Sequence, residues 1–459
     1  MDRRCAPRVL KPELLSPGGS LEKVRIAFLY GADAVYTSGK DFGLRGFAHN
    51  LDSGELARAT RIAHGLGKKI YVTVNIFARG SDLVKMAPYL EYLKELRVDG
   101  LIVSDPGVLL LCRQYAADVP LHLSTQANTT NGLSVRFWRE QGVDRINLAR
   151  ELSFEEISEI VASSEAEIEM FVHGAMCMSY SGRCLMSAFL TLPGSAGANE
   201  GAVNSSRPPL VNRSANRGFC TQPCRWSWTL VEQKRPGEFF QVEQDARGSY
   251  IFNSKDLCLI EEIGPLARLG VDAFKIEGRM KGALYVASVT RAYRQAIDLC
   301  AGRSSNSGAR EPWALDLEKI SHRPYTKGTL FAGQASRSGE VETQISYLQT
   351  HTLAGLVRSG QGCDEAPGGG DAGKIFLEVR SRLLPGHRLE FLNPDGSSSF
   401  HLLGSFEDIP GNRLAQANPN SLIRFCVDFP VFPFQVVRVS NEAVAQTCTE
   451  SLELGGAMM

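Results

Sequence analysis

The chain has 459 residues, of which 43% are hydrophobic and 22% are charged, and its formal net charge is zero. This composition excludes a largely disordered chain, and the length suffices for one large barrel-type domain and one further domain. A neutral chain gives no global signal for nucleic acid or a membrane surface, so such a partner would need a local charged patch. No segment resembles a signal peptide or reaches the ~18 apolar residues of a transmembrane helix. We therefore expect a cytoplasmic protein with no membrane partner.

Eight short β-type segments alternate with amphipathic helical segments over the first 300 residues. One helix start is well marked, because Ser153 stands three residues before Glu156 in a capping-box pattern ahead of an apolar face. Such alternation predicts an α/β fold of the TIM-like (β/α)8 barrel type. An open α/β sheet is the alternative, although no GxGxxG motif follows the first strand. The predicted strands are residues 13–16, 33–38, 69–75, 100–105, 121–126, 145–149, 168–173 and 272–277.

The regular alternation stops after the seventh predicted strand. Residues 174–245 contain four cysteines, a segment rich in Gly, Ser, Asn and Pro, and a few β-like runs. Loops that follow barrel strands lie at the C-terminal face, where barrel enzymes build their active sites. We therefore expect this insertion to be functional, with a decorative surface insertion as the alternative.

The chain changes character again after the last barrel helix. Residues 301–320 begin with a small polar segment and are predicted to be a linker, which closes a barrel domain of residues 1–300. Residues 321–459 contain short β-rich segments separated by Gly, Pro, Asn and Asp, and they predict a small β-barrel domain. The predicted C-terminal strands lie in residues 329–334, 374–380, 387–393, 421–432 and 435–440.

Four of the eleven cysteines lie in the insertion as two pairs, with six and three intervening residues. In a long chain without an export signal, cysteines are more often reduced, catalytic or metal-bound than paired in disulfides. Four thiolates can complete a tetrahedral zinc site or an iron–sulfur cluster. The wide, irregular spacing of the cysteines favours an iron–sulfur cluster. A zinc site, a disulfide and unrelated thiols are the alternatives. The four cysteines are Cys177, Cys184, Cys220 and Cys224.

Several motifs in combination resemble a known family. HGAMCMSYSGRC, NRGFCTQPCRW, KDL at residues 255–257 and FKIEGRMK at residues 274–281 resemble the U32 peptidase family of collagenase-like proteins, and within it the branch of tRNA hydroxylation proteins. The resemblance covers the barrel to about residue 300 and, less specifically, the β-rich tail. Residues 193–213 form a longer segment than is usual in the family.

The resemblance implies a specific chemistry. It implies a barrel whose Cys177, Cys184, Cys220 and Cys224 hold an iron–sulfur cluster of the 4Fe–4S type. It also implies oxygen-independent hydroxylation of the wobble uridine of tRNA to 5-hydroxyuridine, with prephenate as a required co-substrate.

Polar residues at the predicted strand ends are candidates for the substrate pocket. Dianionic prephenate needs cationic donors, and Arg can bind a carboxylate through two hydrogen bonds while Lys supplies a point charge. His173 and Glu277 are candidates for catalytic proton transfer, because an imidazole or a pocket carboxylate can be tuned towards neutral pH. The alternatives are a hydrogen-bonded structural histidine and a simple Glu277–Arg279 ion pair. The predicted substrate-binding residues are Gln126, Lys255, Asp256 and Arg279.

A basic segment within the insertion is the candidate RNA contact. Residues 203–235 hold six basic residues and one acidic residue, with aromatic residues between them. Basic groups can neutralise phosphates, and aromatic rings can stack on an extruded base. We predict that Arg217, Arg225 and Trp226 contact tRNA; a solvated basic loop around a small local core is the alternative.

Two other functions compete with RNA modification. A U32-type peptidase is the first, although the chain has no GxSxG or HExxH motif, and a cysteine nucleophile would compete with metal binding for the same thiols. The second is a non-catalytic tRNA-binding protein whose metal site is structural.

Overall fold

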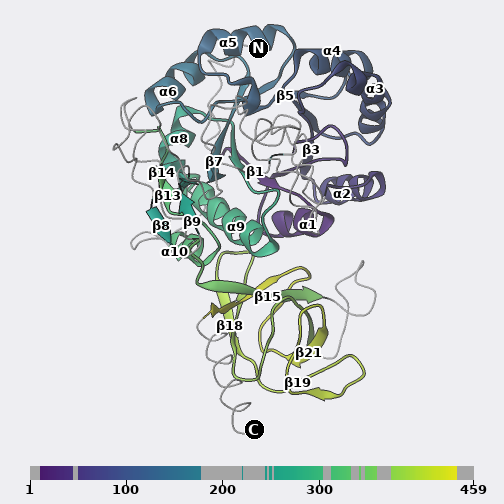
Figure 1. Ribbon diagram of the computed structural model, residues 1–459, viewed down its shortest axis with the longest axis vertical. Coiled ribbons are helices and arrows are strands. Elements are labelled where there is room, and N and C mark those ends of the chain that lie inside the picture. The colour runs from purple at the N-terminus through teal and green to yellow at the C-terminus, as the bar shows by residue number, and fades with distance from the viewer. Residues whose placement is uncertain are drawn as a thin grey trace. The chain divides into compact units, whose positions relative to one another are not determined.

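The computed structural model describes residues 11–44, 50–176, 220, 243–245, 248–250, 253–302, 312–331, 341–342, 347–358 and 374–441. Its internal contacts divide the chain into two units (Figure 1). The first unit comprises residues 1–21, 33–280 and 323–346, and the second comprises residues 22–32, 281–322 and 347–459.

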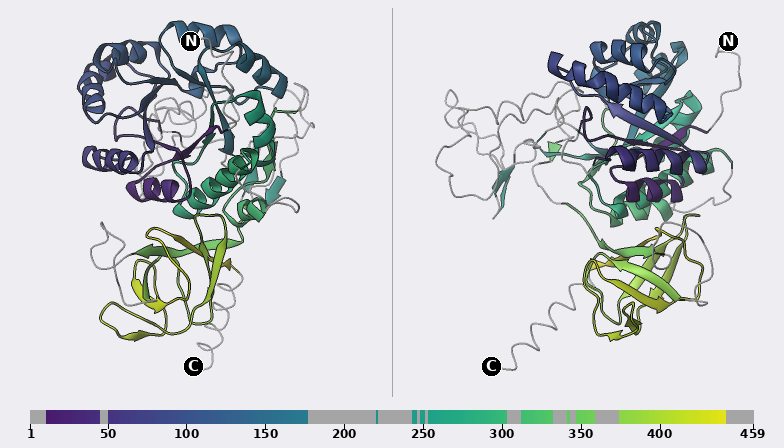
Figure 2. Two further views of the ribbon diagram at one scale, coloured as in Figure 1. Left: turned by 180° about the vertical axis from the view of Figure 1, so that it is seen from behind. Right: turned by 90° about the vertical axis from the view of Figure 1, so that its right-hand side faces the viewer.

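The first unit contains a closed barrel of eight parallel strands, seen as a ring in the left-hand view of Figure 2. The strands follow the order β12, β1, β2, β3, β4, β5, β6 and β7, and pairing of β7 with β12 closes the ring. The predicted (β/α)8 barrel is therefore confirmed, including all eight strands. These strands are β1 (Glu13–Pro17), β2 (Ala34–Thr37), β3 (Lys69–Val74), β4 (Gly100–Val103), β5 (Leu121–Leu123), β6 (Arg145–Asn147), β7 (Glu167–Ala175) and β12 (Ala273–Ile276).

The helices of this unit lie outside the ring of strands (Figure 1). The predicted capping box of α6 is confirmed, because the Ser153 hydroxyl accepts from the Glu156 backbone N–H at 3.2 Å and the Glu156 carboxylate accepts from the Ser153 backbone N–H at 2.7 Å. No helix in the described part of the chain is long and apolar enough to cross a membrane. The helices are α2 (Ser53–Gly65), α3 (Gly80–Glu95), α4 (Pro106–Tyr115), α5 (Gly132–Glu140), α6 (Phe154–Ser163) and α8 (Ile263–Leu269).

A chain of ion pairs crosses the barrel interior. Barrel interiors are usually filled with layers of branched apolar side chains. Here Arg145 Nη1 lies 2.6 Å from Glu13 Oε1 and 3.7 Å from Glu169 Oε2, and Lys275 Nζ lies 2.7 Å from Glu169 Oε1. Arg145, Glu169 and Lys275 are all buried. Since a buried charge is tolerated only when it is paired, these residues depend on one another.

Two further strands extend the barrel sheet beyond β7. Strand β11 (Asp256–Cys258) runs antiparallel to the end of β7, with Asp256 opposite Ala175, and β13 (Tyr325–Thr326) runs parallel to β11. Two small antiparallel pairs also form, β8 (Glu243–Asp245) with β9 (Gly248–Tyr250) and β10 (Asn253–Ser254) with β14 (Val341–Glu342). The chain thus leaves the barrel at the end of β7 and returns beside that strand.

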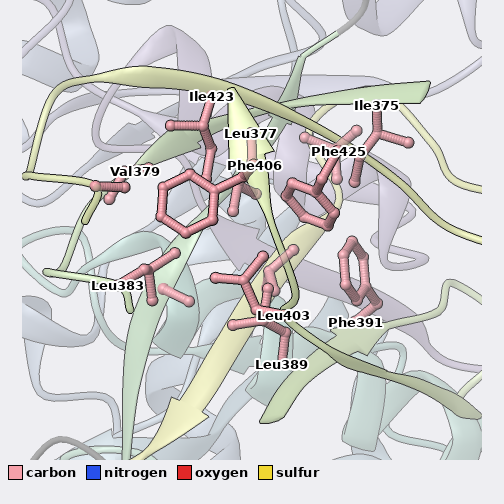
Figure 3. Close-up of a cluster of buried hydrophobic side chains, with 14 of the residues drawn as sticks. Ile375, Leu377, Val379, Leu383, Leu389, Phe391, Leu403, Phe406, Ile423 and Phe425 are labelled. Carbon is pink, nitrogen blue, oxygen red and sulfur yellow. The ribbon is translucent and has the colours of Figure 1, made fainter. Parts of the chain in front are cut away.

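The second unit contains a curled antiparallel sheet, as predicted for the C-terminal region. Its order is β18, β17, β22, β15, β16, β21, β19 and β20. Apolar side chains from several of these strands converge in one core, among them Leu377, Phe391 and Phe406 (Figure 3). The strands are β15 (His351–Arg358), β16 (Lys374–Val379), β17 (Arg388–Leu392), β18 (Ser398–Leu402), β19 (Phe406–Glu407), β20 (Arg413–Leu414), β21 (Leu422–Cys426) and β22 (Val436–Ser440).

The boundaries of the units differ from the predicted domains. Helix α9 (Ala283–Cys300) and all of helix α1 (Leu21–Leu29) except its first residue belong to the second unit. Strand β13 belongs to the first unit. The predicted linker 301–320 contains helix α10 (Pro312–Lys319). Within the predicted strand 329–334, residues 328–331 form a turn, where the Thr329 hydroxyl donates to the carbonyl oxygen of Leu152. Long-range contacts of this kind override local β propensity.

A buried ionic network joins the helices of the second unit to its sheet. Arg438 on β22 donates to Glu390 on β17 at 2.6 Å and to Asp316 on α10 at 2.6 Å. Arg291 on α9 also donates to Asp316. Burial would raise the pKa of Glu390, but the hydrogen bond and charge of Arg438 outweigh it and lower that pKa to about 2. Burial, with the nearby charges of Arg438 and Lys319, lowers the pKa of His351 to about 4.

We expect acid to destabilise this unit in two overlapping steps. A histidine with a lowered pKa in the folded state stays neutral there while the unfolded chain binds a proton, so stability falls as the pH drops from 6.5 to about 4. A carboxylate with a lowered pKa loses its stabilising charge as the pH drops from 4.5 towards about 2. Hydrogen exchange of the β17 and β22 amides, measured in the full chain over a range of pH, reports both losses of stability. His351→Asn should reduce the loss of stability at the higher pH, and Glu390→Gln should reduce the loss at the lower pH. If the pH dependence of stability is unchanged in both variants, these two residues do not cause the losses.

Candidate active site

Polar side chains gather where the barrel strands end, at the C-terminal face. Asn75 follows β3, and its side-chain amide donates to Gln126 Oε1 at 2.8 Å. The Ser124 hydroxyl, just after β5, donates to the same oxygen at 3.1 Å. The Gln126 carbonyl oxygen is therefore occupied, while its amide nitrogen has no hydrogen-bond partner within the described residues. That nitrogen can serve as a donor to a ligand, which fits the predicted substrate-binding role of Gln126.

Two buried cations lie on and just after β12. Arg279 Nη1 donates to Thr73 Oγ1 on β3 at 3.1 Å, so this side chain reaches across the end of the barrel. Lys275 pairs with Glu169 and lies 4.7 Å from the centre of the Tyr36 ring. Burial lowers the pKa of Lys275, with Glu169 opposing the shift and the charge of Arg279 adding to it. The positive charges of Lys275 and Arg279 therefore act on one another, and the Glu169 carboxylate balances the charge of Lys275.

The predicted proton-transfer residues meet at the junction of β7, β11 and β12. The backbone N–H of Glu277 donates to the His173 carbonyl oxygen at 2.9 Å. His173 is buried, stands opposite Cys258 on β11, and its ring centre lies 5.5 Å from that of Tyr325. The structure thus brings His173 and Glu277 together, and their catalytic role stays a prediction.

Asp256, predicted to bind substrate, is held by an arginine that the sequence did not indicate. Arg323 Nη2 and Nε lie 2.6 Å and 3.1 Å from Asp256 Oδ1, and the Arg323 backbone N–H donates to Oδ2 at 3.1 Å. Both side chains are buried. This geometry gives Asp256 a structural role in fixing β11, and binding of substrate by Asp256 stays a prediction. Lys255, which directly precedes β11, is partly exposed.

Arg150 is a second site residue that the sequence did not indicate. It follows β6, its guanidinium lies 4.0 Å from the centre of the Phe171 ring, and its Nη1 donates to the Ala175 carbonyl oxygen at 2.5 Å. A cavity of about 20 Å³ adjoins Arg150 and Phe171, which is room for one water molecule. Arg150 therefore fixes the end of β7, two residues before Cys177. Its only sequence signal is its position just past a predicted strand.

Most of the predicted cofactor and RNA residues lie outside the described residues. These are Cys177, Cys184, Cys224, Arg217, Arg225 and Trp226. Cys220 is described and is half-buried. Within the described ranges, no three His, Cys, Asp or Glu side chains form a metal-binding group. The predicted iron–sulfur, zinc and RNA sites therefore stay predictions.

The fold and the site define a (β/α)8-barrel protein with a polar, cation-lined site at the C-terminal ends of its strands. The chain belongs to peptidase family U32, whose match covers residues 19–340.

Curated relatives extend this similarity to almost the whole chain. The tRNA hydroxylation protein P1 of Bacillus subtilis is 36% identical over 430 residues, which cover 93% of this chain and 94% of that protein. The tRNA hydroxylation protein P of Escherichia coli is 34% identical over 435 residues, covering 86% and 89%. The 23S rRNA 5-hydroxycytidine C2501 synthase of Escherichia coli is 35% identical over 325 residues, covering 68% of this chain and 44% of that protein.

Proposed function

We propose that this protein is an RNA-modifying enzyme that hydroxylates the wobble uridine of tRNA to 5-hydroxyuridine in the cytoplasm. The observation that carries the proposal is the near end-to-end similarity to tRNA hydroxylation proteins, which includes the barrel and the C-terminal unit. A relative named for hydroxylation of ribosomal RNA supports the wider class of RNA hydroxylation.

The barrel site fits an anionic co-substrate, for which we propose prephenate. Arg279 reaches across the strand ends, and its planar guanidinium can bind a carboxylate through two hydrogen bonds. Gln126 offers an amide N–H group at the same face of the barrel. His173 on β7 and Glu277, just after the neighbouring β12, are the proposed carriers of protons between the co-substrate and the base.

The proposed cofactor is a 4Fe–4S cluster on Cys177, Cys184, Cys220 and Cys224, with zinc as the lesser alternative. Four thiolates are a donor set that fits such a cluster, which can supply one-electron chemistry when bound. Strand β7 ends at Ala175, at the C-terminal face of the barrel and two residues before Cys177 in the sequence. Arg217, Arg225 and Trp226, in the same insertion, are the proposed contacts to tRNA.

The test is nucleoside mass spectrometry of tRNA from an Escherichia coli strain that lacks its own tRNA hydroxylation protein P and any redundant pathway. The wild-type chain should restore 5-hydroxyuridine derivatives, and Cys177→Ser should fail to restore them at an equal protein level. Anaerobically purified wild-type protein should be brown and contain iron and sulfide; a colourless zinc protein would refute the cluster.

Other outcomes of the same experiments favour the alternatives. Failure of the wild-type chain to restore the modification would contradict hydroxylation. Binding of tRNA without any modification would favour a non-catalytic binding protein with a structural metal site. Hydrolysis of a protein substrate that persists in Cys177→Ala and Cys220→Ala variants would favour the peptidase.

A further inference from the structure

An exposed tyrosine and a lysine form a small platform in the second unit. Lys281 Nζ lies 5.3 Å from the centre of the Tyr347 ring and 5.2 Å from that of Tyr285, and it donates to the Ser321 carbonyl oxygen at 3.3 Å. Tyr285 is buried, whereas Tyr347 is 46% exposed and its neighbour Leu348 is 49% exposed. The ammonium is therefore held between an inner and an outer ring.

The platform is fixed in position by its backbone. Leu348 and His322 exchange two backbone hydrogen bonds, of 2.8 and 3.1 Å, so the segment that carries Tyr347 is tied to the one that carries Ser321. Both segments contact the same lysine, Tyr347 through its ring and Ser321 through its carbonyl oxygen. The exposed ring is thus presented in one orientation, which lowers the entropy cost of binding a flat partner.

The charge of the platform favours a nucleic acid as its partner. No carboxylate within the described residues forms an ion pair with Lys281, so its positive charge is available to a phosphate. A flat aromatic ring beside an unneutralised cation is the combination that binds single-stranded RNA, because the ring stacks on a base and the cation meets the backbone. An apolar protein partner would have to bury that ammonium without a counter-charge, which is costly.

The partner that these observations fit is an unpaired nucleotide. The Tyr347 ring is exposed and can stack on a base. The Lys281 ammonium lies 5.3 Å from the centre of that ring, so one nucleotide can contact both side chains. We propose that Lys281 and Tyr347 bind an unpaired nucleotide of the tRNA, an inference that rests on the proposed tRNA substrate.

The test measures binding of an unmodified tRNA transcript, and of its anticodon stem-loop, to the full-length holoprotein at several salt concentrations. Tyr347→Ala should weaken binding about tenfold without changing the salt dependence, because it removes stacking alone. Tyr347→Trp should retain binding. Lys281→Met should weaken binding and reduce the slope of log K against log salt by about 0.7, the value for one phosphate contact in a single strand.

A matched pair elsewhere in the second unit provides the control. Arg388 stacks on Phe400 with its guanidinium carbon 4.4 Å from the ring centre, and Phe400 is 50% exposed. Arg388→Met and Phe400→Ala should leave tRNA binding within twofold of the wild type. The proposed contact would be overturned if the Arg388 and Phe400 variants lost as much tRNA affinity as the Lys281 and Tyr347 variants. Normal tRNA binding by Tyr347→Ala and Lys281→Met would also overturn it.

Failure of this contact and failure of the proposed function give different results. If the wild type hydroxylates tRNA and the Tyr347 and Lys281 variants bind it normally, only the contact is wrong. If the wild type binds tRNA but leaves it unmodified, the proposed hydroxylation is wrong, and the variants still decide whether the platform binds RNA. A Tyr347→Ala variant that binds tRNA normally but changes its oligomeric state would assign the platform to a second copy of the chain.

Discussion

Replacing Lys275 with methionine is expected to lower the free energy of unfolding of the barrel by about 3–5 kcal/mol, the usual cost of breaking a buried ion pair from one side. The change leaves Glu169 buried, with Arg145 3.7 Å away as its remaining cation. Desolvation makes an uncompensated carboxylate expensive at this depth. Urea unfolding of the full chain, followed by hydrogen exchange of the β7 and β12 amides, measures the loss.

The matched control removes both partners of the pair. Lys275→Met combined with Glu169→Gln should recover much of the lost stability, because no buried charge is then left without a partner. A single Lys275→Met variant as stable as the wild type would show that the ion pair is not needed for folding. The double variant also separates stability from catalysis: a stable double variant without the proposed hydroxylase activity would give the Lys275–Glu169 pair a role beyond the fold.

Replacing Arg323 with methionine is expected to cost a similar amount, about 3–5 kcal/mol, since it removes the arginine that pairs with the buried Asp256 carboxylate. The loss should be local, because this pair holds β11 and the segment before β13 beside β7. Hydrogen exchange should therefore show faster exchange in β11 and the end of β7, while the amides of β2 to β4 keep their protection.

The same experiment distinguishes the two roles of Asp256. If it only fixes β11, Asp256→Asn and Arg323→Met should lose similar stability, and the double variant should be no worse than either. If Asp256 also contacts substrate, Asp256→Asn should raise KM well above the value for Arg323→Met at a temperature where both variants are folded. Equal KM values in the two variants would refute the substrate-binding prediction.

Much of the fold could be predicted because each barrel strand is a short apolar run with local signals at its ends. The capping box at Ser153 and Glu156 is such a local signal, and the structure contains it. The ion pairs inside the barrel could not be predicted in this way, since Glu13 and Arg145 are 132 residues apart in sequence and meet only when the barrel closes. Local patterns carry no information about such partners.

In the candidate site, too, residues at strand ends could be predicted, whereas their long-range partners could not. His173 lies near the end of β7 and Glu277 directly follows β12, so their closeness results from the parallel arrangement of these two strands. Arg323 lies 67 residues beyond Asp256, in a segment predicted to belong to another domain. Its role depends on β13 returning to the barrel sheet, which no periodicity in the sequence indicates.

The pairing of β11 with the end of β7 has a consequence for how this protein can vary. Residues 176–255 begin and end at directly opposed positions, Ala175 and Asp256, whose Cα atoms in an antiparallel pair lie about 5 Å apart. A segment whose two ends meet can be lengthened, shortened or exchanged with little effect on the free energy of the barrel, because loop-closure entropy depends only weakly on length. The cysteine-bearing segment can therefore be exchanged between relatives during evolution, and a chimaera that takes these residues from a relative should keep a folded barrel.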